Sequence, residues 1–368
     1  PITQKKEVLE RIINICYKPF FTKLLENPEV KITLNVSGCL LEKLTMEYPE
    51  IIKLIEKAKD KGQIEIMGSA FYHPLLPLIN EEDQKYQIRK QTESVKGIFG
   101  TVPIAFFPPE LALTPENIPP IIAEGFKLII SAANSMNLTY GGVYQLDSGE
   151  EIFILKRNRT ISNNISFDQY KRDSEKTERD ISRIYKMDRL PIVLAMDLET
   201  YGEHHSDYYE FFFDLTKRIN TITVSEFLIN YNIATPIDIL YPTSWSTSDE
   251  DMHKQICFPL WNHPENAVHH LLLNHMELLS KTKARLSGRD GVDEYQAAHY
   301  SCQLWWASGL SIEHGFISEE LILTGVNYQR LVLHTMANEL EENFKQMILK
   351  ESENIILKIE QILNEVGN

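Results

Sequence analysis

The chain has 368 residues and a formal net charge of −15, and 43% of its residues are hydrophobic. This composition allows a large core and argues against disorder, while the acidic balance and the lack of a long basic run disfavour a nucleic-acid partner. No stretch reaches the roughly 20 consecutive apolar residues of a membrane span, and residues 1–20 lack the order of a secretory signal. The cysteines are dispersed without a C-x-x-C pair, so we expect reduced thiols and a cytoplasmic protein.

Short β-rich runs alternate with helical patterns through the first two thirds of the chain. The first feature is a helix at 8–25, so a βα repeat read from residue 1 lacks its opening strand, which we expect to lie before Pro1. Further helices are predicted at 50–59 and at 81–99, the latter with Asn80 as N-cap. Strands are predicted at 30–36, 64–67, 103–107, 128–131, 152–156, 192–196 and 221–224. This alternation predicts parallel strands, in a barrel or a doubly wound sheet.

From about residue 265 the pattern becomes helical to the C-terminus. Apolar residues recur at helical spacing in 271–273, 278–279, 321–333 and 355–363, which predicts a helical bundle. The Ser- and Asp-rich stretch 244–251 is the best linker candidate. We therefore predict an incomplete catalytic α/β domain over 1–243 and a helical domain over 244–368 that closes over the active site.

A glutamate follows two prolines after an apolar run, in Phe107-Pro108-Pro109-Glu110. Because proline fixes its own backbone and restricts the preceding residue, Glu110 is presented at a rigid strand exit, which suits a nucleophile. An exposed loop glutamate is the alternative interpretation.

An acidic cluster follows a second apolar run, where Asp197 and Glu199 come directly after 192–196. In a strand these two positions share a face and point into one cavity. Crowded acids raise one another's pKa, so one carboxyl can stay protonated near neutral pH and donate to a leaving oxygen. Acids from two strand ends could thus meet across one site, as glycoside hydrolysis requires. A solvated turn is the alternative.

Tyr72 and His73 follow a third predicted strand. A phenol and an imidazole there could hydrogen-bond a sugar hydroxyl or tune a carboxylate, or the histidine could cap a local turn.

All four tryptophans fall after residue 240. Indoles stack on the apolar faces of sugar rings, which predicts a glycan-binding groove, although core packing is the commoner use of tryptophan. Two of them are adjacent and cannot both face the same way on one helix. The four are Trp245, Trp261, Trp305 and Trp306.

Patterns for metals and nucleotides are missing from the sequence. His263, His269, His270 and His275 cluster, but no pair has i, i+4 spacing and no H-E-x-x-H occurs, so we interpret them as packing or surface residues and expect no metal. Neither G-x-x-x-x-G-K-[ST] nor G-x-G-x-x-G is found. We therefore expect no cofactor.

Three segments in order, FYHPLLPL at 71–78, FPPELAL at 107–113 and MDLETYGEH at 196–204, resemble the sequence blocks of glycoside hydrolase family 57, in particular its α-amylase-like branch. Thr243-Ser244-Trp245 followed by Trp261 agrees with a further block, as does the segment 299–306. Together the blocks span about 230 residues.

The resemblance implies a (β/α)7 barrel with a C-terminal helical domain that acts on α-1,4-linked glucans such as maltooligosaccharides with retention. Glu110 matches the family's nucleophile and Asp197 its acid/base, with carboxyls about 5 to 5.5 Å apart. His73 matches a sugar-subsite residue, and the tryptophans fall where the helical domain closes over substrate. Tyr72, Glu199 and His204 are further substrate-binding candidates. Water as acceptor gives hydrolysis, whereas a sugar acceptor gives a 4-α-glucanotransferase or a branching enzyme.

The chain departs from the family pattern in three places. The His-rich first block is absent, Asn163 and Asn164 stand where the family often carries acids, and the Pro-Pro before Glu110 is an uncommon variant. Two other hypotheses are a non-catalytic glycan-binding relative and a metal-dependent polysaccharide deacetylase, which would need an Asp with two histidines at ligand spacing.

Overall fold

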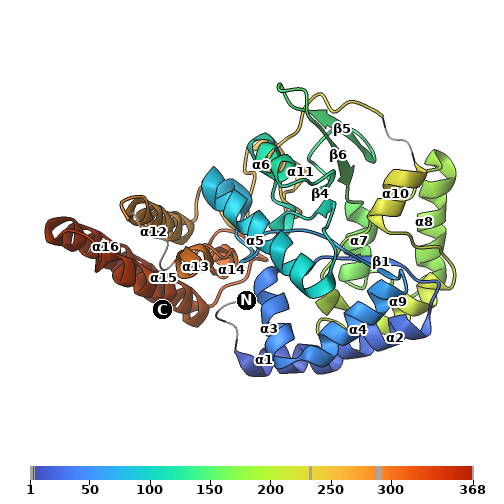
Figure 1. Ribbon diagram of the computed structural model, residues 1–368, viewed down its shortest axis with the longest axis horizontal. Coiled ribbons are helices and arrows are strands. Elements are labelled where there is room, and N and C mark those ends of the chain that lie inside the picture. The colour runs from blue at the N-terminus through green and yellow to red at the C-terminus, as the bar shows by residue number, and fades with distance from the viewer. Residues whose placement is uncertain (1–2, 4, 232–233, 287–291, 367–368) are drawn as a thin grey trace. The chain divides into compact units, whose positions relative to one another are not determined.

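The computed structural model describes residues 3, 5–231, 234–286 and 292–366. The chain divides into two compact units, each described here by itself (Figure 1). The α/β unit consists of residues 4–71 and 84–245, and the helical unit consists of residues 1–3, 72–83 and 246–368.

Parallel strands form the centre of the α/β unit. β1 (Ile32–Leu34) pairs with β2 (Ile64–Ile66), with Ile32 opposite Ile64. β3 (Ala105–Phe106) pairs with β4 (Leu128–Ser131), and β4 pairs with β6 (Glu151–Lys156), again in parallel. The exception is β5 (Gly141–Gln145), which runs antiparallel along β6.

Two single bridges extend this order along the chain. Gly68 bridges to Phe106 and so joins the β2 segment to β3, while Arg157 bridges to Val193 beyond β6, both in parallel. Parallel neighbours therefore follow one another in chain order from β1 to residue 193, as a βα repeat requires.

Two of the predicted strands need correction, and one strand was missed. The segment 192–196 is extended but joins its neighbour only through the bridge at Val193. The segment 221–224 ends in a helix instead, because Thr223 and Glu226 form a reciprocal capping box that starts α10 (Val224–Asn230). The antiparallel strand β5, which begins with two glycines, was not predicted.

Helices surround these strands. The predicted helix at 8–25 is confirmed but is interrupted by a π-helical turn, and Asn80 does cap α5, accepting a bond of 2.9 Å from the Asp83 N–H. The remaining helices are α1 (Lys6–Ile12), the π-helical turn η1 (Ile13–Tyr17), α2 (Lys18–Glu26), α3 (Gly38–Glu47), α4 (Pro49–Asp60), α5 (Glu81–Phe99), α6 (Ile118–Ala123), α7 (Arg159–Ser166), α8 (Ser174–Asp188) and α9 (Tyr209–Thr216).

A cluster of buried side chains joins successive strands on one side. Leu128 and Ile130, two residues apart on β4, point the same way into this cluster. Phe107 and Trp245 pack against it from the segments that follow β3 and precede the helical unit. The other members are Met67, Ala105, Leu111, Ala132, Leu155 and Phe227. The residues just beyond the strands are thereby held on a rigid base.

The helical unit is built mainly from three long helices, α12 (Ala267–Lys283), α15 (Glu319–Ala337) and α16 (Glu342–Val366), which lie side by side (Figure 1). His275 of α12 connects them, since its ring bonds to Gln329 at 2.8 Å and to Ser352 at 2.7 Å. The shorter helices are α11 (Asp249–His253), α13 (Val292–Ala297) and α14 (Cys302–Trp305).

The stretch 244–251 is not a simple linker. Ser248 caps α11, so that helix begins inside the predicted linker, while the division between the compact units falls between Trp245 and Ser246. In the part of the chain that the structure describes, every helix is too short or too polar to cross a membrane.

Candidate active site

Glu110 lies in a tight turn at the end of β3. Residues Pro109–Leu111 form a single 3-10 turn, in which Glu110 adopts φ 59° and Leu111 adopts φ 50°. Non-glycine residues rarely occupy this left-handed region, and holding one there costs roughly 1–3 kcal/mol. Such strain persists only where the surroundings fix it, and it is concentrated at functional sites.

Neighbouring backbone fixes this turn on both sides. The Trp245 N–H donates to the Glu110 carbonyl at 3.0 Å. Leu113 and Thr243 exchange two backbone hydrogen bonds of 3.0 and 3.1 Å, so the segment after Glu110 pairs with the segment before Trp245. The Trp245 side chain also hydrogen-bonds the Glu110 carboxyl. Trp245, which the sequence predicts to bind sugar, thus hydrogen-bonds both the backbone and the carboxyl of Glu110.

Asp197 and Glu199 lie in a turn, not in a strand as predicted. Asp197 has extended backbone and precedes the 3-10 helix η5 (Leu198–Tyr201), to which Glu199 belongs. The two carboxyls are nevertheless close enough for the charge of Glu199 to raise the pKa of Asp197. The two acids are therefore brought together by a tight turn, and not by a strand in which alternate side chains share a face.

Arg157 is a residue at this site that sequence reasoning did not identify. It follows β6, and its guanidinium donates to the Ala195 carbonyl at 2.7 Å and to Asn163 at 2.8 Å. It also lies over the Trp245 ring, 5.8 Å from the centroid, and its charge lowers the pKa of Asp197. The signal in the sequence was Asn163, which stands where acids were expected and instead accepts a bond from this arginine.

The charge of one predicted catalytic carboxyl, Asp197, acts on the other, Glu110. Burial raises the pKa of Glu110 to about 8, and the charge of Asp197 contributes to that rise, whereas the hydrogen bond from Trp245 opposes it. Burial and then the charge of Glu199 raise the pKa of Asp197 to about 7, against the effect of Arg157. Part of the surface of Asp197 is accessible to solvent, although protein atoms surround its carboxyl. Both carboxyls therefore ionise at a higher pH than ordinary carboxyls do.

Burial raises the pKa values of both carboxyls towards neutral pH, so both can hold a proton there, and the titration belongs to the pair. The predicted cycle needs a protonated Asp197 beside an ionised Glu110, so a bound substrate has to select that form.

Tyr17 is a second residue that sequence reasoning did not identify. It stands at the end of the π-helical turn η1, and its buried hydroxyl donates to the Glu199 carboxylate. Burial and the charge of Glu199 raise the pKa of Tyr17 well above its usual range, so the phenol stays a donor. The signal was Pro19, which cannot supply a backbone N–H within the predicted helix.

His204 has an exposed side chain, near enough to Glu203 to lower the pKa of that carboxyl. Glu203 also forms an ion pair with Arg11 of α1, with bonds of 3.0 and 3.1 Å from the guanidinium Nε.

Five predicted site residues belong to the helical unit. His73 adopts φ 60°, its ring bonds to Ser301 at 3.0 Å, and burial lowers its pKa to about 4. Tyr72 is partly buried beside it in the sequence. Trp261 and Trp306 are buried, whereas Trp305 is 37% exposed and stacks on Phe316 at 4.6 Å. Adjacent Trp305 and Trp306 do face different ways, as predicted.

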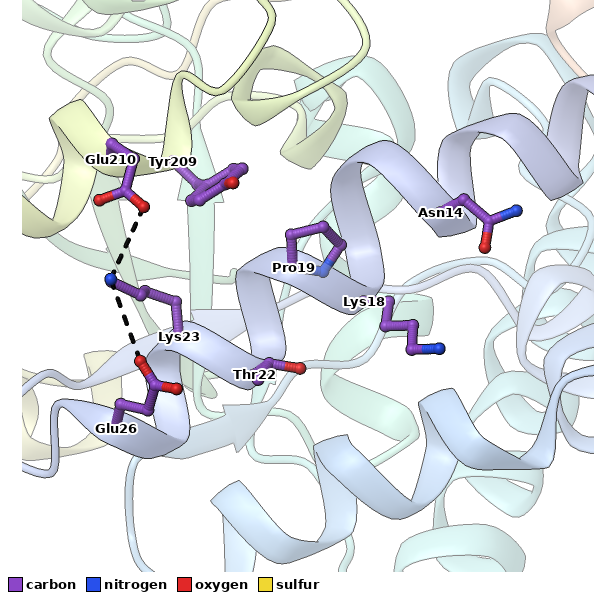
Figure 2. A pocket seen from close by; sticks show the side chains of 8 residues that line it. All are labelled: Asn14, Lys18, Pro19, Thr22, Lys23, Glu26, Tyr209 and Glu210. Carbon is purple, nitrogen blue, oxygen red and sulfur yellow. Dashed lines mark ion pairs between the residues drawn. The ribbon is translucent and has the colours of Figure 1, made fainter.

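An open groove of about 510 Å³ lies elsewhere on the α/β unit (Figure 2). The Lys23 ammonium lies between the carboxylates of Glu26 and Glu210 in it, at 4.0 and 3.6 Å, and so offsets part of their negative charge. Its lining contains no predicted site residue: Asn14, Lys18, Pro19, Thr22, Lys23, Glu26, Tyr209 and Glu210. The acid pair at the strand ends has the chemistry that this groove lacks, and we place the candidate active site there. Over residues 3, 5–231, 234–286 and 292–366, no group of three or more His, Cys, Asp or Glu side chains is arranged to hold a metal ion.

The curated relatives of the chain include proteins named alpha-amylase and 4-alpha-glucanotransferase. An "Alpha-amylase" of Pyrococcus furiosus is 33% identical over 154 residues, which cover 40% of this chain and 24% of that protein. A "4-alpha-glucanotransferase" of Thermococcus litoralis is 29% identical over 258 residues, or 64% of this chain and 37% of that protein. The chain thus spans well under half the length of these two relatives.

Solved structures share the fold. The 4-alpha-glucanotransferase from Thermococcus litoralis superimposes with a TM-score of 0.72 at 20% identity, covering 93% of this chain and 57% of that one. The GH57-type branching enzyme from Pyrococcus horikoshii gives 0.70 at 14% identity, covering 97% and 92%. In the sequence, residues 1–240 match the family described as "Glycosyl hydrolase family 57". The chain therefore belongs to glycosyl hydrolase family 57.

Proposed function

We propose that this protein is a retaining glycoside hydrolase that cleaves α-1,4-linked glucans, with Glu110 as the nucleophile and Asp197 as the acid/base. The observation that carries the proposal is the acid pair itself. Two carboxyls that are 87 residues apart in the chain lie close enough for the charge of Asp197 to raise the pKa of Glu110, and the pKa values of both are raised towards neutral pH. A retaining cycle needs one ionised and one protonated carboxyl.

In the first step the Glu110 carboxylate attacks the anomeric carbon. The bond from that carbon to the glycosidic oxygen breaks, and Asp197 gives its proton to the departing oxygen. The product is a glycosyl ester on Glu110 and an ionised Asp197. In the second step Asp197 takes a proton from water, whose oxygen attacks the anomeric carbon and restores the free Glu110 carboxylate.

Substrate binding would set the proton order that this cycle needs. Positive charge develops at the anomeric carbon, which favours an ionised Glu110 beside it, while the leaving oxygen accepts a proton from Asp197. The hydrogen bond from Trp245 to Glu110 favours the same order, because it stabilises the charged carboxylate.

The architecture that we propose for the whole protein is a (β/α)7 barrel followed by a helical domain. The parallel strands in chain order support the barrel. Glu110 follows β3, and Asp197 follows the extended segment that bridges to Arg157 at Val193, and such barrels build their sites just beyond the carboxyl ends of their strands. We further propose that residues 1–243 carry the chemistry, and that His73 and the exposed Trp305 contribute to sugar binding.

A second candidate function is 4-α-glucanotransfer on the same residues. A match of 29% identity to a relative named as such covers 64% of this chain. The two functions differ only in the second step, in which a sugar hydroxyl replaces water. Incubation with maltooligosaccharides of one defined length separates them, because hydrolysis gives only shorter chains and transfer gives longer chains as well.

Two variants test the proposed roles. Glu110→Gln removes the covalent route and should abolish turnover of maltooligosaccharides while the fold is retained. Asp197→Asn should spare substrates with good leaving groups, such as aryl glycosides, more than it spares glucans, because acid assistance matters least there. An unchanged rate for Glu110→Gln, or equal losses on both substrates for Asp197→Asn, contradicts the assignment. Glucan binding without turnover by the parent chain would favour the non-catalytic alternative.

A further inference from the structure

The N-terminal helix of the α/β unit contacts the turn that contains Asp197 and Glu199 through two hydrogen bonds and an aromatic pair. Tyr17 donates its hydroxyl to Glu199, and the neighbouring Cys16 thiol donates to the Leu198 carbonyl at 3.0 Å. One turn later, Phe20 packs on Tyr201 with ring centroids 5.5 Å apart. Three of the four residues of η5 thus contact one helix, through a backbone carbonyl, a carboxylate and an aromatic ring.

A π-helical turn makes these contacts possible. The Lys18 N–H bonds to the Ile13 carbonyl, a five-residue step that places one extra residue in the turn. The cause lies in Pro19, which lacks an N–H and crowds the carbonyl of Ile15 four residues earlier. The extra residue shifts the helix register, so that Cys16 and Tyr17 both reach η5.

Gly202 shows how closely the two segments approach. A Cβ atom at this position would lie 2.2 Å from the Ile15 carbonyl oxygen, too close for any residue but glycine. The freed carbonyl of the π-helical turn therefore lies directly against the end of η5. A helix without the π-helical turn would present different atoms here.

We propose that Tyr17 is a positioning residue that anchors the Glu199 carboxylate beside Asp197, and so helps Asp197 to keep the proton that the reaction consumes. This inference rests on the proposed role of Asp197 as the acid/base. Tyr17 touches Glu199 rather than substrate, so it acts through a neighbouring charge.

The charges around Asp197 set the sign of the effect. Glu199 and Arg157 act on it in opposite directions, the first raising and the second lowering its pKa. Removing the Tyr17 hydroxyl frees the Glu199 carboxylate to turn toward water, which reduces the like-charge effect and lets the Asp197 pKa fall. The other titratable groups of this cluster are Glu110, Cys16 and the Tyr17 phenol itself.

A direct titration of Asp197 in the full chain tests the proposal without substrate. Carboxyl ¹³C NMR on protein labelled at aspartate, with Asp197→Asn for assignment, should show the Asp197 midpoint falling by roughly one pH unit in Tyr17→Phe. The limb of the pH profile for glucan cleavage that reports Asp197 should move by the same amount. If the parent cleaves no glucan, the proposed function fails, while the titration still decides the role of Tyr17.

Tyr208→Phe is the matched control, because it removes another buried hydroxyl, which donates to the Ile165 carbonyl at 2.9 Å. It should leave the Asp197 midpoint in place. Glu199→Gln keeps an acceptor for Tyr17 but removes the charge, so it should lower the Asp197 midpoint as Tyr17→Phe does. If Tyr17→Phe does not fold, Glu199→Gln takes its place in the titration. An unchanged or raised midpoint in either Tyr17→Phe or Glu199→Gln, or an equal fall in Tyr208→Phe, overturns the proposal.

Discussion

Glu110→Gln should make the protein more stable at alkaline pH. The carboxyl of Glu110 has a pKa of about 8 in the folded chain against an ordinary 4.5, because burial disfavours its charge. A raised folded pKa gives stability that is fully present below 4.5 and is lost as pH rises through 8, since the unfolded chain ionises first. Glutamine has the same shape, never ionises and can accept the same bond from Trp245.

The size of the gain follows from the difference between the two pKa values. At about 1.4 kcal/mol per unit, ionisation of the unfolded chain takes roughly 4 kcal/mol from the free energy of unfolding by pH 8, but less than about 1 kcal/mol at pH 5. These are upper bounds, because Glu110 stays partly accessible to water. We expect a gain of about 2 to 4 kcal/mol at pH 8 that shrinks toward pH 5.

Urea denaturation of parent and variant at pH 5, 6, 7 and 8 measures this gain. Glu116→Gln is the control from the same region, because hydrogen bonding to Thr114 lowers the pKa of Glu116 and its replacement should not stabilise the chain at any of these pH values. A Glu110→Gln variant that is no more stable than the parent at pH 8, or a gain that does not depend on pH, would refute the reasoning. Ionisation of the buried Glu110 carboxyl would then not lower the free energy of unfolding as the structure indicates.

Three further predictions concern the residues around the site and the helical unit. Arg157→Gln removes the cation that lowers the Asp197 pKa, so the Asp197 midpoint should rise by roughly one pH unit in the same NMR titration; a fall would contradict this. Gly202→Ala forces a Cβ atom against the Ile15 carbonyl and should lower the free energy of unfolding by roughly 1–3 kcal/mol. Gly97→Ala is its control, because a Cβ atom at that position would meet no atom within 4 Å, and it should not destabilise the chain. Burial lowers the pKa of His275 from 6.5 to about 4. The neutral ring therefore stabilises the folded chain fully above pH 6.5, and this part of the free energy of unfolding is lost as pH falls toward 4, at roughly 1 kcal/mol per unit. His275→Gln should make the fall in melting temperature between pH 6.5 and 4 less steep, and an unchanged slope would count against this prediction.

Much of the fold could be predicted from local sequence patterns. Period-3.6 apolar spacing gave the helices of the C-terminal region, and Asn80 marked the start of α5 correctly. Errors arose where a short cap outweighed β propensity, as at Thr223 and Glu226, or where pairing reduced a strand to one bridge, as at Val193. Pairing depends on distant partners, which a local pattern does not contain.

The candidate site could be predicted only in part. Glu110 and Asp197 stand out because acids after apolar runs are unusual, yet the left-handed turn at Glu110 depends on Thr243 and Trp245, more than a hundred residues away. For Arg157 the only local signal was Asn163, six residues away, because its other hydrogen bond goes to the distant Ala195 carbonyl. Pro19 was a visible sign of the π-helical turn, but nothing local connects it with Glu199.

The central claim is that Glu110 forms the glycosyl ester that Asp197 then helps to resolve. A fluorinated α-glucosyl fluoride, which reacts through the first step and slows the second, tests it most directly by peptide mass spectrometry. The Glu110 carboxylate displaces the anomeric fluoride, so we predict one added fluorohexosyl group on the peptide that contains Glu110, and none in Glu110→Gln. A label on another residue, or turnover of this reagent by Glu110→Gln at the parental rate, would contradict the account.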